Sequence, residues 1–294
     1  MQLRENGVFA IDKPQYFTSF DVVAKLRGIL GIRKIGHGGT LDPLATGVLP
    51  IFIGKATKAV DLVADSLKRY TVTVKIGIKT DTGDITGDIT ERSSVIPDEA
   101  TLREVLSSFI GVGEQIPPMY SAIKVNGRHL YDIARSGAVV ERNPRPIEIL
   151  SINLLNYDQL QKEFKYEVYC SKGTYIRTLT EDIAFKLSTV ATVFTLRRTQ
   201  SGPFSEDDCL TFETITKYVN AGDRDFILPV ESLFSSLKSY TLSDKQNYLF
   251  MNGVSFPVDC IKEDEVMLKI LYKGKMIALG KTIEGNLKSV AKFV

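Results

Sequence analysis

Apolar residues recur along this chain in two patterns, one typical of strands and the other typical of helices. Residues 70–76 alternate between polar and apolar side chains, as a half-buried strand does. Residues 7–11 and 48–53 are almost continuously apolar, which is typical of strands that are buried on both faces. The same reasoning predicts strands over residues 7–11, 48–53, 70–76, 145–157, 163–171 and 190–198.

Helices are predicted where apolar residues return every three or four positions behind a residue that can cap a helix. Between residues 18 and 30 this spacing is carried by Phe20, Val23, Leu26 and Leu30, and Thr18 or Ser19 precedes them as the cap. The predicted helices cover residues 18–30, 56–64, 98–109, 175–187 and 229–237. Strands outnumber helices, and no regular strand–helix alternation occurs. The sequence therefore predicts an α+β fold, with a mixed, mainly antiparallel sheet flanked by helices.

Two loops are predicted from their turn residues. Residues 79–88 are rich in Thr, Asp and Gly, so we expect an exposed loop there. The dipeptide Asn126-Gly127 suits a type I′ turn, which predicts a β-hairpin between residues 121–125 and 128–131.

The character of the sequence changes near residue 239, which predicts two domains, 1–238 and 239–294. The second segment predicts one short helix and about three short strands, with turns at Lys273-Gly274 and Glu284-Gly285. Its length is near the minimum that can fold as a small β-rich module. We therefore expect it to pack against the larger domain.

Residues 36–43 (GHGGTLDP) are the most informative stretch of the chain. Its glycines allow backbone or ligand to come close, while Pro43 fixes its own φ and disfavours helix at Asp42. The apolar run 48–53 follows, so a carboxylate would be held on a stiff loop next to a buried strand. Catalytic groups often occupy such loops. However, an Asp before Pro is also a common turn residue that caps its own backbone.

A phosphate-binding loop is a rival interpretation of this region, because Gly54-Lys55-Ala56-Thr57 follows closely. A Walker A loop requires another glycine, separated from the Gly-Lys pair by four residues, and Ser or Thr directly after the lysine. Leu49 and Ala56 occupy these two positions. The rival interpretation therefore fails.

The composition is ordinary for a folded protein in a reducing compartment. Of the 294 residues, 44% are hydrophobic and 24% are charged. The three cysteines are scattered without zinc or redox spacing, and two histidines are too few for a histidine-rich metal centre. An all-oxygen Mg²⁺ site stays open. With no apolar stretch of membrane-spanning length and no apparent signal peptide, we expect a cytoplasmic protein without membrane contact, and by default a monomer.

The net charge of +2 does not by itself demand a polyanionic partner, but the charge is unevenly distributed. Residues 1–60 contain 8 Lys or Arg residues against 4 Asp or Glu residues, and the tail beyond Lys238 is also rich in lysine. A basic surface that attracts nucleic acid is compatible with this distribution and is not required by it.

Several segments, taken in order, resemble one family of known proteins. They are Asp12-Lys13-Pro14 with Thr18-Ser19, GHGGTLDPLATGVLPIFIGKATK from Gly36 to Lys58, Lys68-Arg69-Tyr70, QIPPMYSAIKVNGRHLYDIAR from Gln115 to Arg135, SKGTYIRTLTEDIA from Ser171 to Ala184, and Leu196-Arg197-Arg198 with Ser201-Gly202-Pro203-Phe204. Together they resemble the bacterial tRNA pseudouridine synthases of the TruB type, which modify uridine 55 in the T arm. The family usually has glycine where this chain has Tyr16, so we expect a differently shaped first turn.

The resemblance implies a pseudouridine-synthase-like catalytic domain and a small C-terminal RNA-binding module that is PUA-like. It also implies tRNA, through its T arm, as the partner. Conversion of uridine to pseudouridine breaks the N1–C1′ bond, rotates the uracil and joins C5 to C1′. Because neither a redox change nor net hydrolysis occurs, we expect no cofactor and no metal.

By resemblance, Asp42 is the catalytic carboxylate that acts on the electron-poor sugar carbon. Arg177 matches the family's ion-pair partner, which would keep Asp42 ionised in a dry site. Tyr70 matches the tyrosine that stacks on the flipped uracil, and its phenol could also serve proton removal from C5. Without the resemblance, Arg177 would be taken as a surface helix charge and Tyr70 as a core aromatic residue.

Other residues are implied in substrate binding. His37 resembles the residue that helps to hold the disrupted T loop, and Leu196 resembles an apolar wall of the uracil pocket. Lys13 and Lys124 are candidate phosphate contacts. Two simpler interpretations stay open, in which His37 is a turn residue bonded to local backbone and Leu196 is an interior strand residue. Residues 128–131, near the predicted hairpin, could contribute to RNA recognition.

Two other functions are compatible with parts of the sequence. A non-catalytic tRNA-binding protein or RNA chaperone would use the same basic surface, but would not require Asp42 with Arg177. A nucleoside glycosidase would need a second acidic residue as proton donor, and no nearby motif supplies one. The sequence also leaves open whether Asp42 attacks the sugar, attacks the base or promotes elimination.

Overall fold

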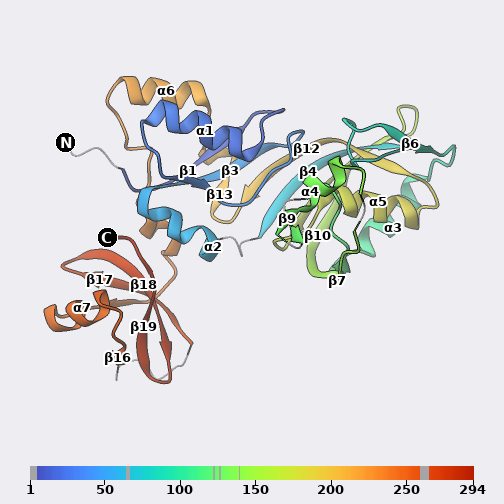
Figure 1. Ribbon diagram of the computed structural model, residues 1–294. Coiled ribbons are helices and arrows are strands. Elements are labelled where there is room, and N and C mark those ends of the chain that lie inside the picture. Colours follow the sequence, from blue (N-terminus) through green and yellow to red (C-terminus); the bar gives the residue numbers. More distant parts are fainter. Residues whose placement is uncertain (1–4, 64–66, 122, 126, 139, 259–264) are drawn as a thin grey trace.

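The computed structural model describes the chain apart from residues 1–4, 64–66, 122, 126, 139 and 259–264 (Figure 1). Most of the described chain is built on one sheet of ten strands, in the order β14-β1-β3-β12-β4-β11-β10-β7, with β13 beside β12 and β2 beside β3. The strands are β1 (Gly7–Lys13), β2 (Ile35–His37), β3 (Thr46–Ile53), β4 (Lys68–Ile76), β7 (Gly111–Gln115), β10 (Arg145–Asp158), β11 (Glu163–Cys170), β12 (Ala191–Ser201), β13 (Phe204–Ser205) and β14 (Cys209–Leu210).

The strand pairs of this sheet are antiparallel, apart from β1 with β14 and β3 with β12. This arrangement confirms the predicted mixed, mainly antiparallel sheet. The parallel contact between β3 and β12 pairs Thr46 with Arg197 and Gly47 with Arg198. A side chain at Gly47, whose φ is 100°, would place its Cβ 2.2 Å from the carbonyl oxygen of Arg198. Glycine is therefore required where the two halves of the sheet meet.

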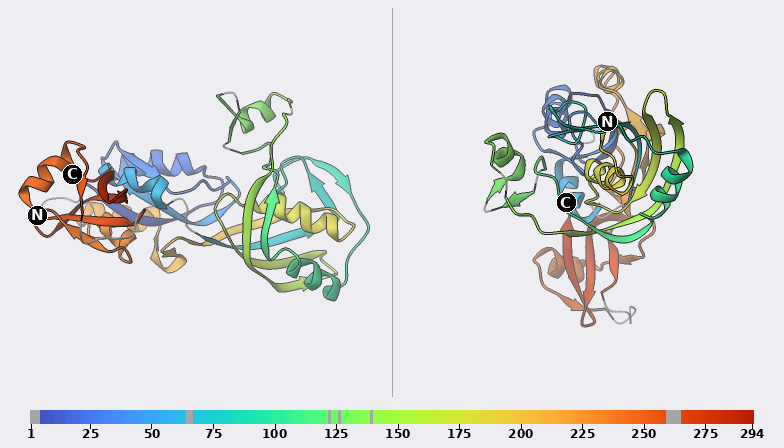
Figure 2. Two further views of the ribbon diagram at one scale, coloured as in Figure 1. Left: turned by 90° about the horizontal axis from the view of Figure 1, so that it is seen from below. Right: turned by 90° about the vertical axis from the view of Figure 1, so that its right-hand side faces the viewer.

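Helices pack on both halves of the sheet and complete its apolar core. Beside β1 lie α1 (Ser19–Leu30) and α6 (Phe212–Asn220), and the sheet curves around α5 (Ile176–Lys186) at the other end (Figure 2). The helix α3 (Glu99–Ser107) packs against α5 and β10. Helix α1 begins where the sequence predicts, because Thr18 and Asp21 form a reciprocal capping box.

A small lobe extends from the sheet next to β7 and contains helix α4 (Figure 2). Its elements are β8 (Lys124–Val125), β9 (Arg128–His129) and α4 (Leu130–Arg135). The predicted hairpin is confirmed by the pairing of β8 with β9, although Asn126 of its turn lies outside the described residues. The remaining short elements of the large domain are η1 (Gly54–Ala59), α2 (Val60–Val63), β5 (Ile78–Thr80), β6 (Ile89–Arg92), η2 (Glu206–Asp208) and η3 (Val230–Phe234).

The C-terminal segment forms a second, five-stranded sheet with its own apolar core. Its elements are β15 (Ser239–Thr241), α7 (Asp244–Met251), β16 (Phe256–Pro257), β17 (Met267–Tyr272), β18 (Lys275–Ile283) and β19 (Asn286–Lys292). A shared apolar cluster joins the two parts, with Phe234 stacked on Phe293 near Val8 and Phe52. The small module therefore packs against the large domain, as its size led us to expect.

Several local predictions need correction. Phe20 is 64% exposed, because the buried face of α1 is formed by Ser19, Val22, Val23, Leu26 and Leu30. The segment predicted as a helix over residues 56–64 begins in the 3₁₀ turn η1 and continues as the short α-helix α2, and residue 64 lies outside the described residues. The segment predicted over residues 229–237 contains the 3₁₀ turn η3 instead of an α-helix, and α6 was missed. Residues 79–88 are not wholly exposed, because Thr80 and Asp84 are buried and the Thr80 hydroxyl donates to the Asp84 carbonyl oxygen. Among the described residues, no helix combines the length and apolar character needed to cross a bilayer.

Candidate active site

The loop that carries Asp42 is fixed by backbone bonds on both sides. At its start, Gly38 donates to the carbonyl oxygen of Pro50 at 2.8 Å. The backbone N–H of Leu41 donates to the hydroxyl of Ser19 at 2.9 Å, so the first turn of α1 supports the loop. Tyr16 donates from its backbone to the carbonyl oxygen of Pro43 at 2.7 Å. The carboxylate is thus carried on a rigid support with its side chain 33% exposed.

Lys13 reinforces the same support from the interior. It is fully buried, and its ammonium donates to the carbonyl oxygens of Phe17 at 2.6 Å, Pro14 at 3.0 Å and Pro43 at 3.4 Å. Burial lowers its pKa to about 8, partly opposed by the negative charge of Asp42. The prediction of a phosphate contact is therefore corrected, because this ammonium is turned inward and holds the loop that carries Asp42.

Arg177 binds Asp42 through two parallel contacts. Its Nε lies 2.8 Å from Oδ2 of Asp42, and its Nη2 donates to Oδ1 at 3.1 Å. The same guanidinium donates to the carbonyl oxygens of Thr82 at 2.8 Å and Tyr120 at 2.7 Å. Arg177 is 5% exposed, although it lies in the first turn of α5, where the helix dipole disfavours a cation. The carboxylate compensates this cost through its charge-assisted contacts with the guanidinium.

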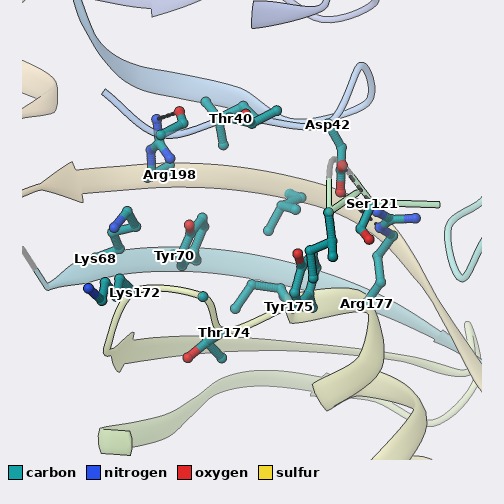
Figure 3. Close-up of a pocket in the computed structure, with 16 residues that line it drawn as sticks. Thr40, Asp42, Lys68, Tyr70, Ser121, Lys172, Thr174, Tyr175, Arg177 and Arg198 are labelled. Carbon is teal, nitrogen blue, oxygen red and sulfur yellow. Dashed lines mark hydrogen bonds and ion pairs between the residues drawn. The ribbon is translucent and has the colours of Figure 1, made fainter. Parts of the chain in front are cut away.

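Asp42 and Arg177 border a cavity of about 420 Å³ that is also lined by residues of the neighbouring strands β4 and β12 (Figure 3). Such a volume is in the range typical of ligand pockets. The lining residues are Gly39, Thr40, Leu41, Asp42, Lys68, Tyr70, Ser121, Ile123, Lys172, Gly173, Thr174, Tyr175, Ile176, Arg177, Leu196 and Arg198. Among these described residues Asp42 is the only carboxylate. The structure therefore brings four predicted site residues together: Asp42, Tyr70, Arg177 and Leu196.

Tyr70 lies across the cavity from the Asp42 loop, on β4. It is 6% exposed, and its partner across the β4–β12 ladder is Arg198. Burial raises the pKa of the Tyr70 phenol, and the neighbouring positive charge of Arg198 opposes that rise. Leu196, on β12 like Arg198, is also 6% exposed and adds an apolar wall. An uncharged planar group would therefore find both an aromatic and an aliphatic surface here.

Arg198 was quoted in the sequence motif without a predicted role, and the structure makes it prominent. It is fully buried, with Nε donating to the carbonyl oxygen of Val48 at 2.7 Å and Nη2 to that of Gly39 at 3.1 Å. These two carbonyls lie on either side of the Asp42 loop. Within the part of the chain that the structure describes, Nη1 has no hydrogen-bond partner. Arg198 therefore ties both sides of the loop to β12.

One predicted binding residue, His37, is not among the described residues that line the cavity. His37 lies on β2, half-buried, and its Nδ1 has no hydrogen-bond partner among the described residues. Burial lowers the pKa of His37, and the positive charge of Arg198 lowers it further. Lys124 lies on β8, but its side chain is outside what the structure describes.

Sequence reasoning also missed a polar contact that supports Tyr175, a lining residue next to α5. The buried side chain of Gln115 accepts from the backbone N–H of Tyr175 at 2.7 Å and donates to its carbonyl oxygen at 3.0 Å. Gln115 thereby fixes the backbone two residues before Arg177. Only its place at the start of a quoted motif could have pointed to it.

Comparison with known proteins gives this geometry a family context. The model of the TruB family pseudouridylate synthase, N-terminal domain, matches residues 27–176, and that of the tRNA pseudouridylate synthase B C-terminal domain matches residues 177–235. The chain belongs to the TruB family of pseudouridylate synthases. Within this family, the tRNA pseudouridine synthase B of Clostridium tetani is 42% identical over 295 residues, covering 98% of this chain and 100% of that protein. The Bacillus licheniformis protein of the same name is 44% identical over 254 residues, covering 84% and 82%.

Solved structures show the same fold. In the crystal structure of a Cbf5–Nop10–Gar1 complex, a chain that is 25% identical superposes with a TM-score of 0.74, covering 99% of this chain and 85% of that chain. In family terms, Asp42 and Tyr70 fall in the N-terminal model, whereas Arg177, Leu196 and Arg198 fall in the C-terminal model. The candidate site is thus assembled from both family domains.

Proposed function

We propose that this member of the TruB family isomerises uridine 55 in the T arm of tRNA to pseudouridine, with Asp42 as the catalytic carboxylate. The observation that carries the proposal is the bidentate ion pair between Asp42 and Arg177, two residues that line the same cavity. The tRNA substrate is supported by relatives named tRNA pseudouridine synthase B that align over almost the whole chain.

The chemistry requires an ionised carboxylate beside the sugar of an extruded nucleotide. Breaking the N1–C1′ bond leaves C1′ electron-poor, and a carboxylate can stabilise or attack that carbon. Attack on the base and elimination to a glycal require the same charged group. Arg177 holds the Asp42 carboxylate through two charge-assisted contacts, while a side-chain exposure of 33% leaves the carboxylate accessible to substrate.

The rest of the cavity supports isomerisation over hydrolysis. The detached uracil must be retained and turned before C5 meets C1′, so the walls have to hold a flat, uncharged ring. Tyr70 would offer a stacking surface for the flipped base and Leu196 an apolar wall, and we propose that the Tyr70 phenol takes part in proton removal from C5, which its position among the lining residues supports. A glycosidase would require a second acid, and Asp42 is the only carboxylate among the described lining residues.

RNA binding outside the cavity is assigned to the remaining predicted residues. His37 and Lys124 are proposed to contact the disrupted T loop and a phosphate, respectively. Residues 1–238 would form the catalytic domain and residues 239–294 a PUA-like RNA-binding module. A cytoplasmic monomer is proposed, because the substrate is tRNA and the predicted site draws on a single chain.

The test is conversion of unmodified T-arm RNA by wild type and Asp42→Asn. We expect pseudouridine with wild type and none with the variant, while RNA affinity stays within about threefold because the side chain keeps its size. Asp207→Asn, which removes an exposed carboxylate elsewhere, is the matched control and should keep full activity. Equal conversion by wild type and Asp42→Asn would contradict the assignment and favour an RNA chaperone.

A further inference from the structure

The turn between β1 and α1 contains an unusual residue beside the Asp42 loop. Tyr16 has a φ of 67°, which falls in the left-handed region that glycine adopts freely and bulky residues avoid. It is nevertheless 73% exposed, so no burial of its ring compensates the strain. Stability alone would favour glycine at this position. Strain of this kind persists where a side chain has a use.

A second exposed aromatic residue follows Tyr16 in the sequence. It is Phe20, four residues later on the first turn of α1, which is 64% exposed. We call Tyr16 and Phe20 the rim aromatics. The guanidinium of Arg27 lies 5.8 Å from the centre of the Phe20 ring, and Arg27 is itself exposed. The rim aromatics and Arg27 thus supply exposed flat rings and positive charge, the combination that binds unstacked nucleobases.

The position of Tyr16 next to the Asp42 loop indicates which part of a bound RNA this residue would contact. The backbone N–H of Tyr16 donates to the carbonyl oxygen of Pro43, the residue directly after Asp42. A cavity of about 420 Å³ has room for the extruded nucleotide but not for the nucleotides on either side of it. When the target sugar lies at Asp42, its neighbours in the chain must therefore cross the outer surface of this part of the protein.

The charge along α1 agrees with an RNA occupant. Arg27 lies beside Phe20, and Lys25, Arg33 and Lys34 are exposed elsewhere on the helix or just after it, whereas Asp21 is the exposed acidic side chain on that helix. Asp21 is occupied as a cap, accepting from the backbone and hydroxyl of Thr18. The positive excess attracts a phosphate backbone, and the rings supply stacking that does not depend on sequence.

We propose that Tyr16, assisted by Phe20, stacks on an unpaired base of the substrate RNA that flanks the extruded uridine. The inference rests on the proposed function, and it adds a contact made by a residue outside those that line the cavity. The cost of the left-handed Tyr16 is offset only when RNA is bound, so the side chain acts in binding and not in folding.

This role predicts opposite changes in stability and in RNA binding. Tyr16→Gly relieves the strain, so we expect the thermal midpoint of the free protein to rise by roughly 1–3 °C. We expect its affinity for unmodified T-arm RNA to fall about fivefold or more, as when one base–aromatic stack is lost. Tyr16→Phe keeps the ring and should keep the affinity. The slope of log Kd against log salt should stay the same in all three proteins, because no charge is removed.

A spectroscopic test reads the contact directly, because the chain has no tryptophan. Tyr16→Trp introduces the sole indole, and stacking on a base should quench its fluorescence during titration with T-arm RNA. Phe185→Trp is the matched control, since Phe185 is 83% exposed at the far end of α5. Its emission should not change. Unchanged Tyr16→Trp emission during binding that is seen by gel shift, together with unchanged affinity of Tyr16→Gly, would overturn the inference.

The two proposals fail in different ways. If wild type forms pseudouridine but Tyr16→Gly binds RNA as tightly as wild type, only the stacking contact is wrong. If wild type neither binds nor converts T-arm RNA, the proposed function is wrong, and the stacking contact that rests on it falls as well.

Discussion

The two ends of the candidate active site each contain a buried arginine, and the two arginines are bound differently (Figure 3). Arg177 contacts the carboxylate of Asp42 twice. Its guanidinium also donates to two backbone carbonyl oxygens. Arg198 is bound to the carbonyls of Val48 and Gly39, and no carboxylate among the described residues pairs with it. One cation thus serves a reactive group and the other serves the backbone.

The supports of the two arginines differ as well. Arg177 lies in the first turn of α5 and donates to the carbonyl oxygens of Thr82 and Tyr120, so the geometry at Asp42 depends on several separate segments. Arg198 extends from a central strand to both sides of the Asp42 loop. Arg177, in α5, therefore pairs with the charged group of the site, whereas Arg198, on β12, holds the backbone on both sides of the Asp42 loop in place. Substitutions of the two residues should therefore damage different properties.

Removal of the Arg177 guanidinium should have the largest effect on catalysis. Arg177→Met leaves the Asp42 carboxylate without its two charge-assisted bonds, so we expect at least about a 100-fold loss of kcat/KM. Single-turnover conversion of T-arm RNA measures this loss. Arg177→Lys keeps the charge but not the paired geometry, and it should recover only part of the activity. Activity of Arg177→Met within threefold of wild type would contradict the role in holding Asp42.

Removal of the Arg198 guanidinium should instead act mainly on folding. Arg198→Met leaves two carbonyl groups beside the Asp42 loop without their donors, which costs about 2 kcal/mol or more in the free energy of unfolding. Urea unfolding measures the change, and the folded fraction should keep more activity than Arg177→Met. Unchanged stability of Arg198→Met together with lost conversion would contradict the backbone role of Arg198, because this residue would then act on the substrate.

The sequence predicted the Asp42 loop for a local reason, namely that glycines and proline near one carboxylate constrain its own backbone. Its partner Arg177 lies 135 positions along the chain and came from the family resemblance. Arg198 was not assigned a role, because its importance arises where β3 and β12 meet in space, and no local pattern encodes that contact. Lys13 was misjudged for a similar reason, since a lysine in a polar turn gives no sign that its ammonium is turned inward.

Secondary structure followed the same division between local and distant causes. The start of α1 was predicted, because the two residues of its capping box, Thr18 and Asp21, lie only three positions apart in the sequence. The buried face of that helix was misread at Phe20, because Ser19 and Phe20 both fit the helical spacing, and it is Ser19 that faces inward, where its hydroxyl bonds the backbone of Leu41. Thr80 and Asp84 looked like loop residues, yet contact with β12 buries them, and the Thr80 hydroxyl bonds that of Thr192. Polar residues become interior when distant partners satisfy them.

The smallest effect concerns His37, which is linked to the Arg198 end of the site. The pKa of His37 is lowered by burial and by the positive charge of Arg198, so the unfolded chain binds its proton more readily than the folded chain. Stability should therefore fall as the pH drops below about 6.5 and should be insensitive to this group above about pH 7.5. His37→Gln should remove that loss, which is at most about 1.4 kcal/mol per pH unit. The measurement is the difference in urea midpoint between pH 7.5 and pH 5.5 for wild type and His37→Gln, in which the carboxylates common to both proteins cancel. Equal acid sensitivity in the two proteins would show that neither burial nor the positive charge of Arg198 lowers the pKa of His37.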